Sequence, residues 1–307
     1  NVSIASGTTF HYNSSGNTTL AGIISGDGTF TKANSGSLTL SNTNTYTTAT
    51  SINNGTLELT GTGSVNTSSG ITVNGSTAKF LHSSSVAVTP SVALTQGTVT
   101  GSGSINTVNV ANAAGNVVSN NNGTAGASLT MGTLNFAGAA TVNTFSSSTA
   151  PAIITTNLSS NAAGVITINP SALSWTNGST YDLISYGGGS IGGAGFPQFV
   201  LGTVTGLSGR QNTPTLTNSG TALTLSITGD QAYWVGDTDN KWNTTTINNW
   251  KLLSNNNYTT FLAAGDDVVF NDNASGVGDV TVDIDLANVS PAATLFNHSN
   301  TRNYTLS

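Results

Sequence analysis

Apolar and polar residues alternate in short segments along residues 1–229, and Gly, Asn and Ser separate one segment from the next. Residues 37–41, 56–60 and 71–73 are clear examples, and residues 222–227 form the last one. Successive side chains of a β-strand point to opposite faces, so this alternation predicts strands with one buried face and one face in water. The first 229 residues are therefore predicted to fold as a succession of short β-strands.

A glycine-rich pattern repeats between the predicted strands. Gly-x-Gly, then Thr or Ser, then an apolar residue, occurs at residues 26–30, 61–65 and 101–105, with spacings of 35 and 40 residues. Short strands that recur with glycine turns at such periods are typical of solenoids, and each spacing fits two coils of about 20 residues. Strands every ~8–12 residues are also typical of β-sandwich modules with Greek-key connections, which are the alternative prediction.

The composition favours the solenoid. Thr (52), Ser (39), Asn (38) and Gly (36) make up more than half of the 307 residues, whereas charged residues make up 6%. In a β-solenoid, equivalent positions of successive coils lie about 4.8 Å apart, where like charges repel but Ser, Thr and Asn side chains hydrogen-bond along the stack. Residues that favour helices, such as Glu, Lys, Arg and Met, are scarce. We therefore predict an all-β protein built around a parallel β-solenoid.

The composition changes after residue 229. Residues 230–307 hold nine of the twelve acidic residues and three of the four Trp residues. The alternating pattern returns at residues 280–286 and again at residues 304–307. These features predict two domains: a β-solenoid over residues 1–229, and a smaller aromatic and acid-rich β segment over residues 230–307 that returns to solenoid-type strands.

Residues 24–65 resemble a known repeat. The residues that carry the resemblance are Gly26-Asp27-Gly28-Thr29-Phe30-Thr31-Lys32, Ser37-Leu38-Thr39-Leu40, Asn44-Thr45-Tyr46 and Gly55-Thr56-Leu57. This order of Gly, Lys, Leu, Asn and Tyr resembles the autotransporter-associated β-strand repeat, also called the passenger-associated transport repeat. Asn34, Asn42 and Thr48 stand where that family usually has Gly, and Asn also tolerates left-handed backbone conformations.

The C-terminal segment resembles a block that stands beside this repeat in large bacterial surface proteins. The residues that carry this second resemblance are Tyr233-Trp234-Val235-Gly236, Lys241-Trp242-Asn243, Asn249-Trp250 and Gly265-Asp266-Asp267-Val268-Val269-Phe270-Asn271-Asp272. Together the two resemblances imply a secreted, right-handed β-helix at a bacterial cell surface. They also imply a structural or adhesive role.

We interpret the chain as a structural, extracellular β-solenoid unit of a large repetitive surface protein. The strand pattern is uncapped at both ends of the sequence, and open strand edges pair with one another. We therefore expect units to stack head to tail into a rod or fibre, so that the partner is another copy or the next unit of one long chain. The residues expected at these contacts are Val2, Ile4, Tyr304, Thr305, Leu306 and Ser307. An adhesin passenger that binds surface glycans is the alternative.

An acidic cluster in the C-terminal segment is the candidate metal site. Its members, within 20 residues, are Asp266, Asp267, Asp272, Asp279, Asp283 and Asp285. Oxygen ligands at this density suit Ca²⁺, which is the one cofactor that the sequence suggests. The alternative interpretation is that these carboxylates are solvated and lie in turns. Asp237 and Asp239 form a second, smaller pair.

Three Trp residues, Trp234, Trp242 and Trp250, are spaced by eight positions. If they are buried, they form the small core of the C-terminal segment. If they are exposed, their rings provide surfaces on which sugars stack. The buried interpretation is favoured, and the exposed alternative makes these three residues the candidate glycan-binding site.

Catalytic chemistry has little support in the sequence. His11, His82 and His298 are isolated, and no serine-nucleophile motif surrounds them. A β-helix enzyme that degrades polysaccharides combines acids with bases, but neither Arg210 nor Arg302 neighbours the acidic cluster in sequence. We therefore predict no enzymatic activity and no catalytic residue, and such an enzyme is the least favoured alternative.

Two further classes of partner are excluded by the sequence. Six dispersed Lys and Arg residues are too few to bind nucleic acid by counterion release. No run of about 20 apolar residues is present that could cross a membrane as a helix.

Overall fold

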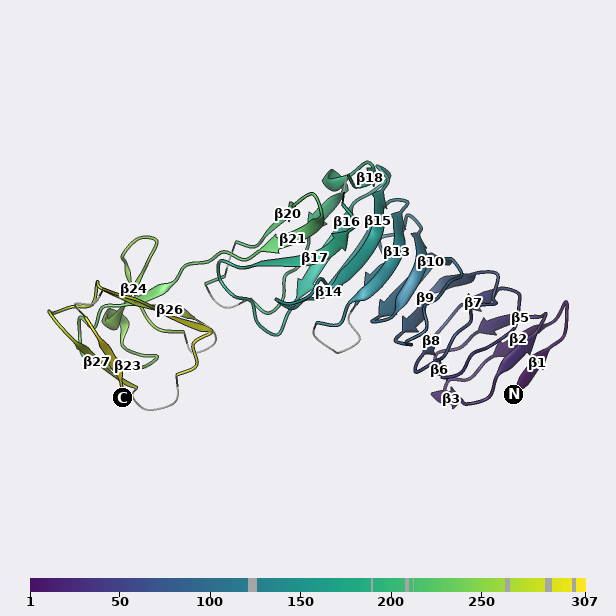
Figure 1. Cartoon of the computed structure of the whole chain (residues 1–307), viewed down its shortest axis with the longest axis horizontal. Helices are drawn as coiled ribbons and strands as arrows, with labels where there is room; N and C mark the ends of the chain where they lie inside the picture. Colours follow the sequence, from purple (N-terminus) through teal and green to yellow (C-terminus); the bar gives the residue numbers. More distant parts are fainter. Residues whose placement is uncertain are drawn as a thin grey trace. The chain divides into compact units, whose positions relative to one another are not determined.

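The computed structural model describes residues 1–120, 126–188, 190–207, 210–211, 213–262, 266–284, 289–299 and 302–307. In these residues the protein is all-β, as predicted, with large and mostly parallel sheets (Figure 1). No helix in this part of the chain is long and apolar enough to cross a membrane.

The chain divides into two compact units. Unit 1 comprises residues 1–172, 181–205 and 216–225. Unit 2 comprises residues 173–180, 206–215 and 226–307. The long C-terminal part of unit 2 begins close to the composition change at residue 230, but the unit also includes two earlier segments that the sequence pattern assigned to the solenoid.

Unit 1 consists of short strands joined by tight turns. The elements that lie wholly or mostly in unit 1 are β1 (Val2–Ile4), β2 (Thr9–Tyr12), β3 (Thr18–Leu20), β4 (Ile24–Gly26), β5 (Thr29–Lys32), β6 (Ser37–Leu40), β7 (Thr50–Ile52), β8 (Thr56–Leu59), β9 (Ile71–His82), β10 (Val92–Gly101), β11 (Ser104–Val110), β12 (Val117–Ser119), β13 (Leu129–Phe136), β14 (Ala140–Phe145), β15 (Ile153–Ser160), β16 (Ile166–Ser171), β17 (Thr180–Tyr186), β18 (Gly192–Gly193), the 3₁₀ helix η1 (Phe196–Gln198), β19 (Phe199–Leu201), β20 (Thr215–Asn218) and β21 (Ala222–Ser226).

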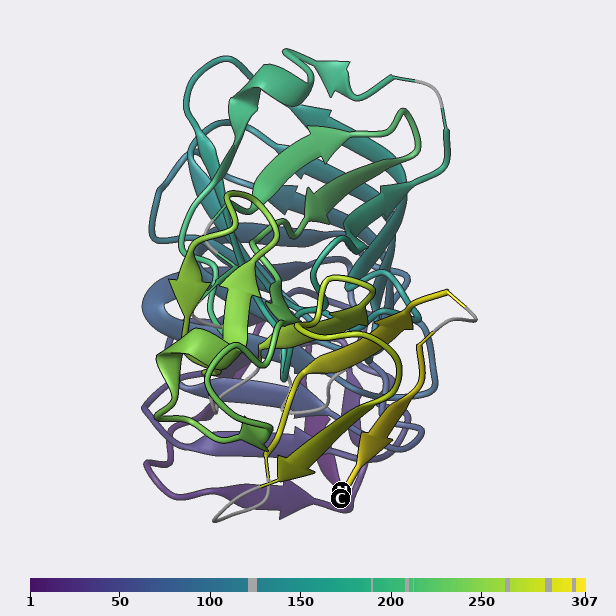
Figure 2. The same ribbon diagram turned by 90° about the vertical axis from the view of Figure 1, so that its left-hand side faces the viewer.

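The strands of unit 1 stack in parallel layers, as Figures 1 and 2 show from purple to teal. One ladder of paired positions runs through Phe10, Phe30, Thr50, Ile71, Val92, Val108, Leu134 and Leu158. A second runs through Thr18, Leu38, Leu57, Phe80, Val99, Val118, Val142, Ile168 and Leu201. A third runs through Val88, Ile105, Met131, Thr155 and Tyr186.

The ladders place apolar side chains inside unit 1. Phe30, Leu57, Phe80 and Val99, for example, are fully buried. The registers described for β1–β19 are all parallel. Because Greek-key sandwiches are built from antiparallel sheets, the sandwich alternative is wrong for this part of the chain.

Buried asparagines connect neighbouring layers of unit 1. Oδ1 of Asn116 accepts the N–H of Gly97 at 3.1 Å, and Nδ2 donates to the carbonyl of Leu94 at 3.3 Å. Asn44 and Asn120 are also buried, and they bond to backbone groups about one layer away. These amides add side-chain hydrogen bonds to the backbone hydrogen bonds between layers.

Unit 2 contains three parallel layers and one antiparallel hairpin. Its elements after residue 226 are β22 (Ala232–Trp234), β23 (Lys241–Trp242), the 3₁₀ helix η2 (Ile247–Asn249), β24 (Trp250–Leu252), β25 (Tyr258–Thr259), β26 (Asp267–Asn271), β27 (Val280–Ile284), β28 (Ala293–Asn297) and β29 (Tyr304–Leu306). The layer of β26 and β27 lies between that of β22 and β23 and that of β28 and β29, with parallel pairing throughout. The hairpin β24–β25 pairs with the outer edge of β22.

Candidate functional site

The three Trp residues of the C-terminal pattern form the core of unit 2. Trp234, Trp242 and Trp250 are 1%, 2% and 0% exposed. The ring centroids of Trp234 and Trp250 lie 5.0 Å apart, and both rings contact Phe270. This burial counts against the prediction that the three rings stack on sugars, and it supports the interpretation that they form a core. The spacing of eight reflects a shared apolar core.

Asn249 fixes the loop that follows Trp234. This fully buried side chain accepts the backbone N–H of Thr238 at 3.1 Å and that of Asp239 at 3.2 Å through Oδ1. Its Nδ2 donates to Oδ1 of Asp239 at 2.5 Å and to the carbonyl of Lys241 at 2.9 Å. One amide thus satisfies both donors and acceptors of a tight loop, a role that the sequence pattern did not indicate.

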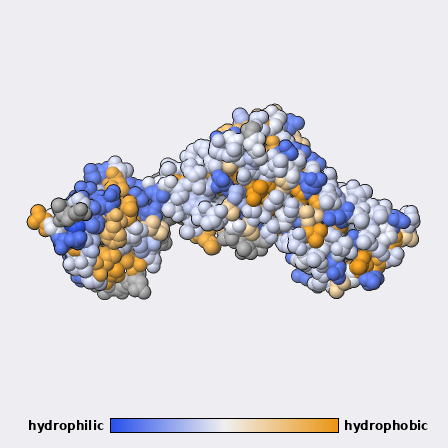
Figure 3. All heavy atoms as spheres, in the orientation of Figure 1, coloured by the Kyte–Doolittle hydropathy of each residue, from blue (hydrophilic) through white to orange (hydrophobic). Residues whose placement is uncertain are grey.

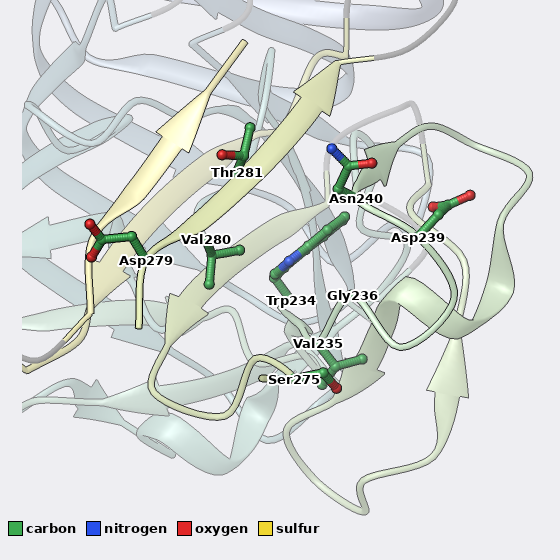
Figure 4. A pocket seen from close by; sticks show the side chains of 9 residues that line it. All are labelled: Trp234, Val235, Gly236, Asp239, Asn240, Ser275, Asp279, Val280 and Thr281. Atoms are coloured by element: carbon green, nitrogen blue, oxygen red, sulfur yellow. The ribbon is translucent and has the colours of Figure 1, made fainter. Parts of the chain in front are cut away.

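A pocket of about 220 Å³ lies beside this loop (Figure 4). It is lined by Trp234, Val235, Gly236, Asp239, Asn240, Ser275, Asp279, Val280 and Thr281. In Figure 4 the Trp234 ring lies between Asp239 and Asp279, and the two carboxylates point away from it.

Asp237 is the centre of a polar network next to the pocket. It accepts hydrogen bonds from the hydroxyl of Ser275, from Tyr258 Oη at 2.6 Å and from Lys251 Nζ at 3.0 Å. These bonds, above all the one from Ser275, lower the pKa of Asp237 to about 2. The network holds the hairpin β24–β25 to the loop of Asp237.

Arg210 and Asp266 form a buried ion pair. The Nε–Oδ1 distance is 2.6 Å and the Nη2–Oδ2 distance is 3.0 Å, with side-chain exposures of 10% and 0%. Nη2 also donates to the carbonyl of Thr260 at 2.6 Å. No Arg stands beside the acidic cluster in the sequence. The fold nevertheless places Arg210 against Asp266, a member of that cluster 56 positions away.

The other members of the acidic cluster have separate partners. Oδ2 of Asp267 accepts the N–H of Asn177 at 3.1 Å, and burial raises the pKa of Asp267. The remaining described pairs are Asp272 with Ser299, Asp279 with Asn303, and Asp283 with Asn240 and Ser307. Among the described residues, no group of three or more acidic or His side chains is arranged to hold a metal ion. The predicted calcium site therefore gains no support from the structure, and Asp285 lies outside the described residues.

Two ionisable side chains are buried in unit 1. His82 is fully buried with its ring stacked on Phe80, and its Nε2 lies 3.0 Å from the carbonyl of Ser104. Burial lowers the pKa of His82 and that of Lys32. Lys32 Nζ donates to the carbonyls of Asn34 at 2.6 Å and Asn54 at 3.1 Å, so this buried amine is bound to backbone and not to a carboxylate. Both contacts stabilise the stack of layers and offer no reactive group.

The residues predicted to join copies lie in outer strands. Val2 and Ile4 belong to β1, which pairs with β4. Tyr304, Thr305 and Leu306 form β29, which pairs with β27, and Ser307 follows it. Figure 3 shows an apolar band on unit 2, and the exposed large apolar side chains of this unit include Leu295, Phe296 and Leu306.

No family model, no curated protein and no solved structure matches this chain. The resemblance to the autotransporter-associated repeat thus rests on the residues quoted for it.

Proposed function

We propose that unit 1 is a right-handed parallel β-helix and that the chain is a structural, extracellular β-solenoid unit of a large repetitive bacterial surface protein. The observation that carries the proposal is the set of three parallel ladders in unit 1, with apolar positions inside. A strand, crossover and parallel strand in one sheet connect with right-handed geometry in nearly all proteins, which supports the handedness. The resemblance of residues 24–65 supports the location.

The proposed role is mechanical, and the layers provide it. Each coil hydrogen-bonds through its backbone to the coils on both sides, so a load is shared among many bonds. The buried amides of Asn44, Asn116 and Asn120 add hydrogen bonds between coils. Because the chain has no Cys, this cohesion needs no disulfide.

The glycan-binding alternative has less support. Its candidate rings, Trp234, Trp242 and Trp250, pack against one another in the core of unit 2. An adhesive role therefore has to use other residues, and the pocket beside Trp234 places its two carboxylates away from the ring (Figure 4).

Single-molecule pulling of the chain between two handle proteins tests the mechanical role. A coil of about 20 residues releases roughly 65 Å of extended chain, so unit 1 should lengthen in several steps of about that size. Asn116→Ala should lower the force of one step, and Asn106→Ala, at an exposed position, should leave the steps unchanged. Collapse of unit 1 in one low-force event would contradict the mechanical role. Protease treatment of intact source cells tests the surface location.

A further inference from the structure

The turn between β7 and β8 contains an Asn-Gly pair, Asn54-Gly55. Oδ1 of Asn54, which is half-buried, accepts the backbone N–H of Gly55 at 2.8 Å. This bond holds the side-chain amide of Asn54 next to the nitrogen of the following residue. The N–H lies in the peptide plane, and a nitrogen that loses this proton keeps a lone pair in the same direction. The lone pair of Gly55 is therefore directed at the side-chain amide of Asn54.

Two further hydrogen bonds polarise the groups of this turn. Thr77 Oγ1 donates to Oδ1 of Asn54 at 2.6 Å, and it stabilises negative charge that develops on this oxygen when a nucleophile attacks Cγ. Lys32 Nζ donates to the backbone carbonyl of Asn54 at 3.1 Å. A deprotonated peptide group shares its charge between the nitrogen and this carbonyl oxygen, so the bond from Lys32 favours deprotonation of Gly55.

Packing requires Gly at position 55. This residue has a φ angle of 64°, and a Cβ there would lie 2.4 Å from the carbonyl oxygens of Asn34 and Gly36. Gly is the residue that adopts such a conformation at no steric cost. Because Gly has no side chain, it also leaves its nitrogen free to approach Cγ of Asn54.

Asn34, one layer earlier, has part of this arrangement. Its Oδ1 accepts the N–H of Ser35 at 2.8 Å, and Lys32 Nζ donates to its carbonyl at 2.6 Å. The next residue, however, is Ser, whose side chain crowds the nitrogen. Among the described contacts, no hydroxyl donates to Oδ1 of Asn34. The chain therefore contains a close relative of the Asn54 turn that lacks two of its features.

The other described Asn-Gly pairs are arranged differently. In Asn177-Gly178, the N–H of Gly178 donates to the carbonyl of Ile227 at 2.8 Å, so it is not directed at its neighbour's side chain. Asn74-Gly75 lies within strand β9, and no hydrogen bond from the Gly75 N–H to the Asn74 side chain is described. In the described part of the chain, the full set of contacts comes together at Asn54.

We propose that Asn54 is a self-modification site, at which the chain converts a side-chain amide into a carboxylate. The Gly55 nitrogen gives its proton to water and attacks Cγ of Asn54, so that a C–N bond forms. Nδ2 then takes a proton from water and leaves as ammonia, and a five-membered succinimide remains. Water opens this ring at one of its two carbonyls. In sum, an amide and water give a carboxylate and ammonium, and the balance requires no other reactant.

Lys32 also selects the product. Its side chain is fully buried, and its described hydrogen-bond partners are two backbone carbonyls, with no carboxylate among them. If water opens the ring at the carbonyl of Asn54 that Lys32 contacts, the new carboxylate forms beside Nζ and gives a buried ammonium its counter-charge. Opening at this carbonyl yields isoaspartate, because the chain then continues through the former side chain.

Peptide mapping by mass spectrometry, after incubation of the purified chain at mildly alkaline pH, measures the conversion. In the folded chain, Asn54 should convert roughly tenfold faster than Asn74 and Asn177, because its turn holds the reacting groups together. In guanidinium chloride the three should convert at similar rates. Thr77→Val, at an exposed position, should slow Asn54 by roughly tenfold and leave Asn74 unchanged. Ser76→Ala, at the exposed position beside it, is the matched control and should convert like the wild type.

The remaining outcomes decide against the inference. Conversion of Asn54 no faster than that of Asn74 in the folded chain overturns it, and so does equal slowing in Thr77→Val and Ser76→Ala. Lys32→Met should slow the conversion and lower the fraction of isoaspartate in the product. Circular dichroism checks that this buried variant is folded, and if it is not, the comparison of Thr77→Val with Ser76→Ala still decides.

Discussion

Replacing Arg210 by Met should destabilise unit 2 selectively. The guanidinium makes a two-point contact with Asp266, whose side chain is fully buried. Without it, the carboxylate retains one described donor, the N–H of Leu262 at 2.8 Å. Removing one partner of a buried ion pair costs about 3–5 kcal/mol, because the other charge stays buried without compensation. A loss of that size is a large fraction of the stability of a small domain.

The chain carries its own reporter for this experiment. All four Trp residues, at positions 175, 234, 242 and 250, belong to unit 2, so Trp fluorescence in urea follows this unit alone. Far-UV circular dichroism also follows the strands of unit 1. We expect the urea midpoint measured by Trp fluorescence to decrease. The transition of unit 1, measured by circular dichroism, should stay at the same urea concentration.

Two further variants make the result specific. Adding Asp266→Asn to Arg210→Met removes the isolated charge and should recover part of the lost stability. Lys251→Met removes the partner of Asp237 at an exposed site, and it should barely move the midpoint because water screens that pair. A change below about 1 kcal/mol in Arg210→Met, or a double variant no more stable than the single one, would refute the reasoning.

Three other predictions concern unit 1. Asn116→Ala should cost about 1–3 kcal/mol in urea unfolding, because the buried backbone N–H of Gly97 loses its partner. An equal loss in the exposed Asn106→Ala control would contradict this. Burial lowers the pKa of His82 below its unfolded value of 6.5. As the pH falls, the unfolded state therefore binds a proton before the folded state does, and the free energy of unfolding should decrease below pH 6.5. In the His82→Leu variant this decrease should be absent. A Cβ at Gly103 would lie 2.4 Å from the His82 ring, so Gly103→Ala should lower the melting temperature, whereas the unobstructed Gly115→Ala should not.

Local patterns were enough to predict the strands. The alternation over residues 37–41 corresponds to β6, in which Leu38 and Leu40 are fully buried and the residues between them are not. A side chain's face is set by its position in the strand, so sequence shows it directly. The repeated Gly pattern also has a local cause, since Gly26 and Gly101 adopt positive φ angles of 101° and 138° that other residues avoid.

The contacts between layers could not be predicted in this way. Arg210 reaches Asp266 across 56 positions, and nothing in the residues around either one indicates the pairing. The His82 ring has room because residue 103 is Gly, and Gly101 allows the close approach of the His82 backbone. The eight-residue spacing of the Trp residues favours a core but also fits an exposed surface, and the packing against Phe270 places all three rings in the core. Each of these contacts joins residues that are distant in the sequence, so it depends on which layers the fold places next to each other.

The burial of basic side chains has a consequence for how proteases digest the protein. Trypsin-like proteases cut after Lys or Arg, and the chain has six such residues. Lys32 and Arg302 are buried, and Arg210 is held in its ion pair. A protease must therefore wait for the structure to open locally before it reaches half of its cleavage sites. Digestion of the folded protein by such enzymes should begin at Lys79, Lys241 or Lys251, and the stacked layers on either side of Lys32 should be among the last parts to be degraded.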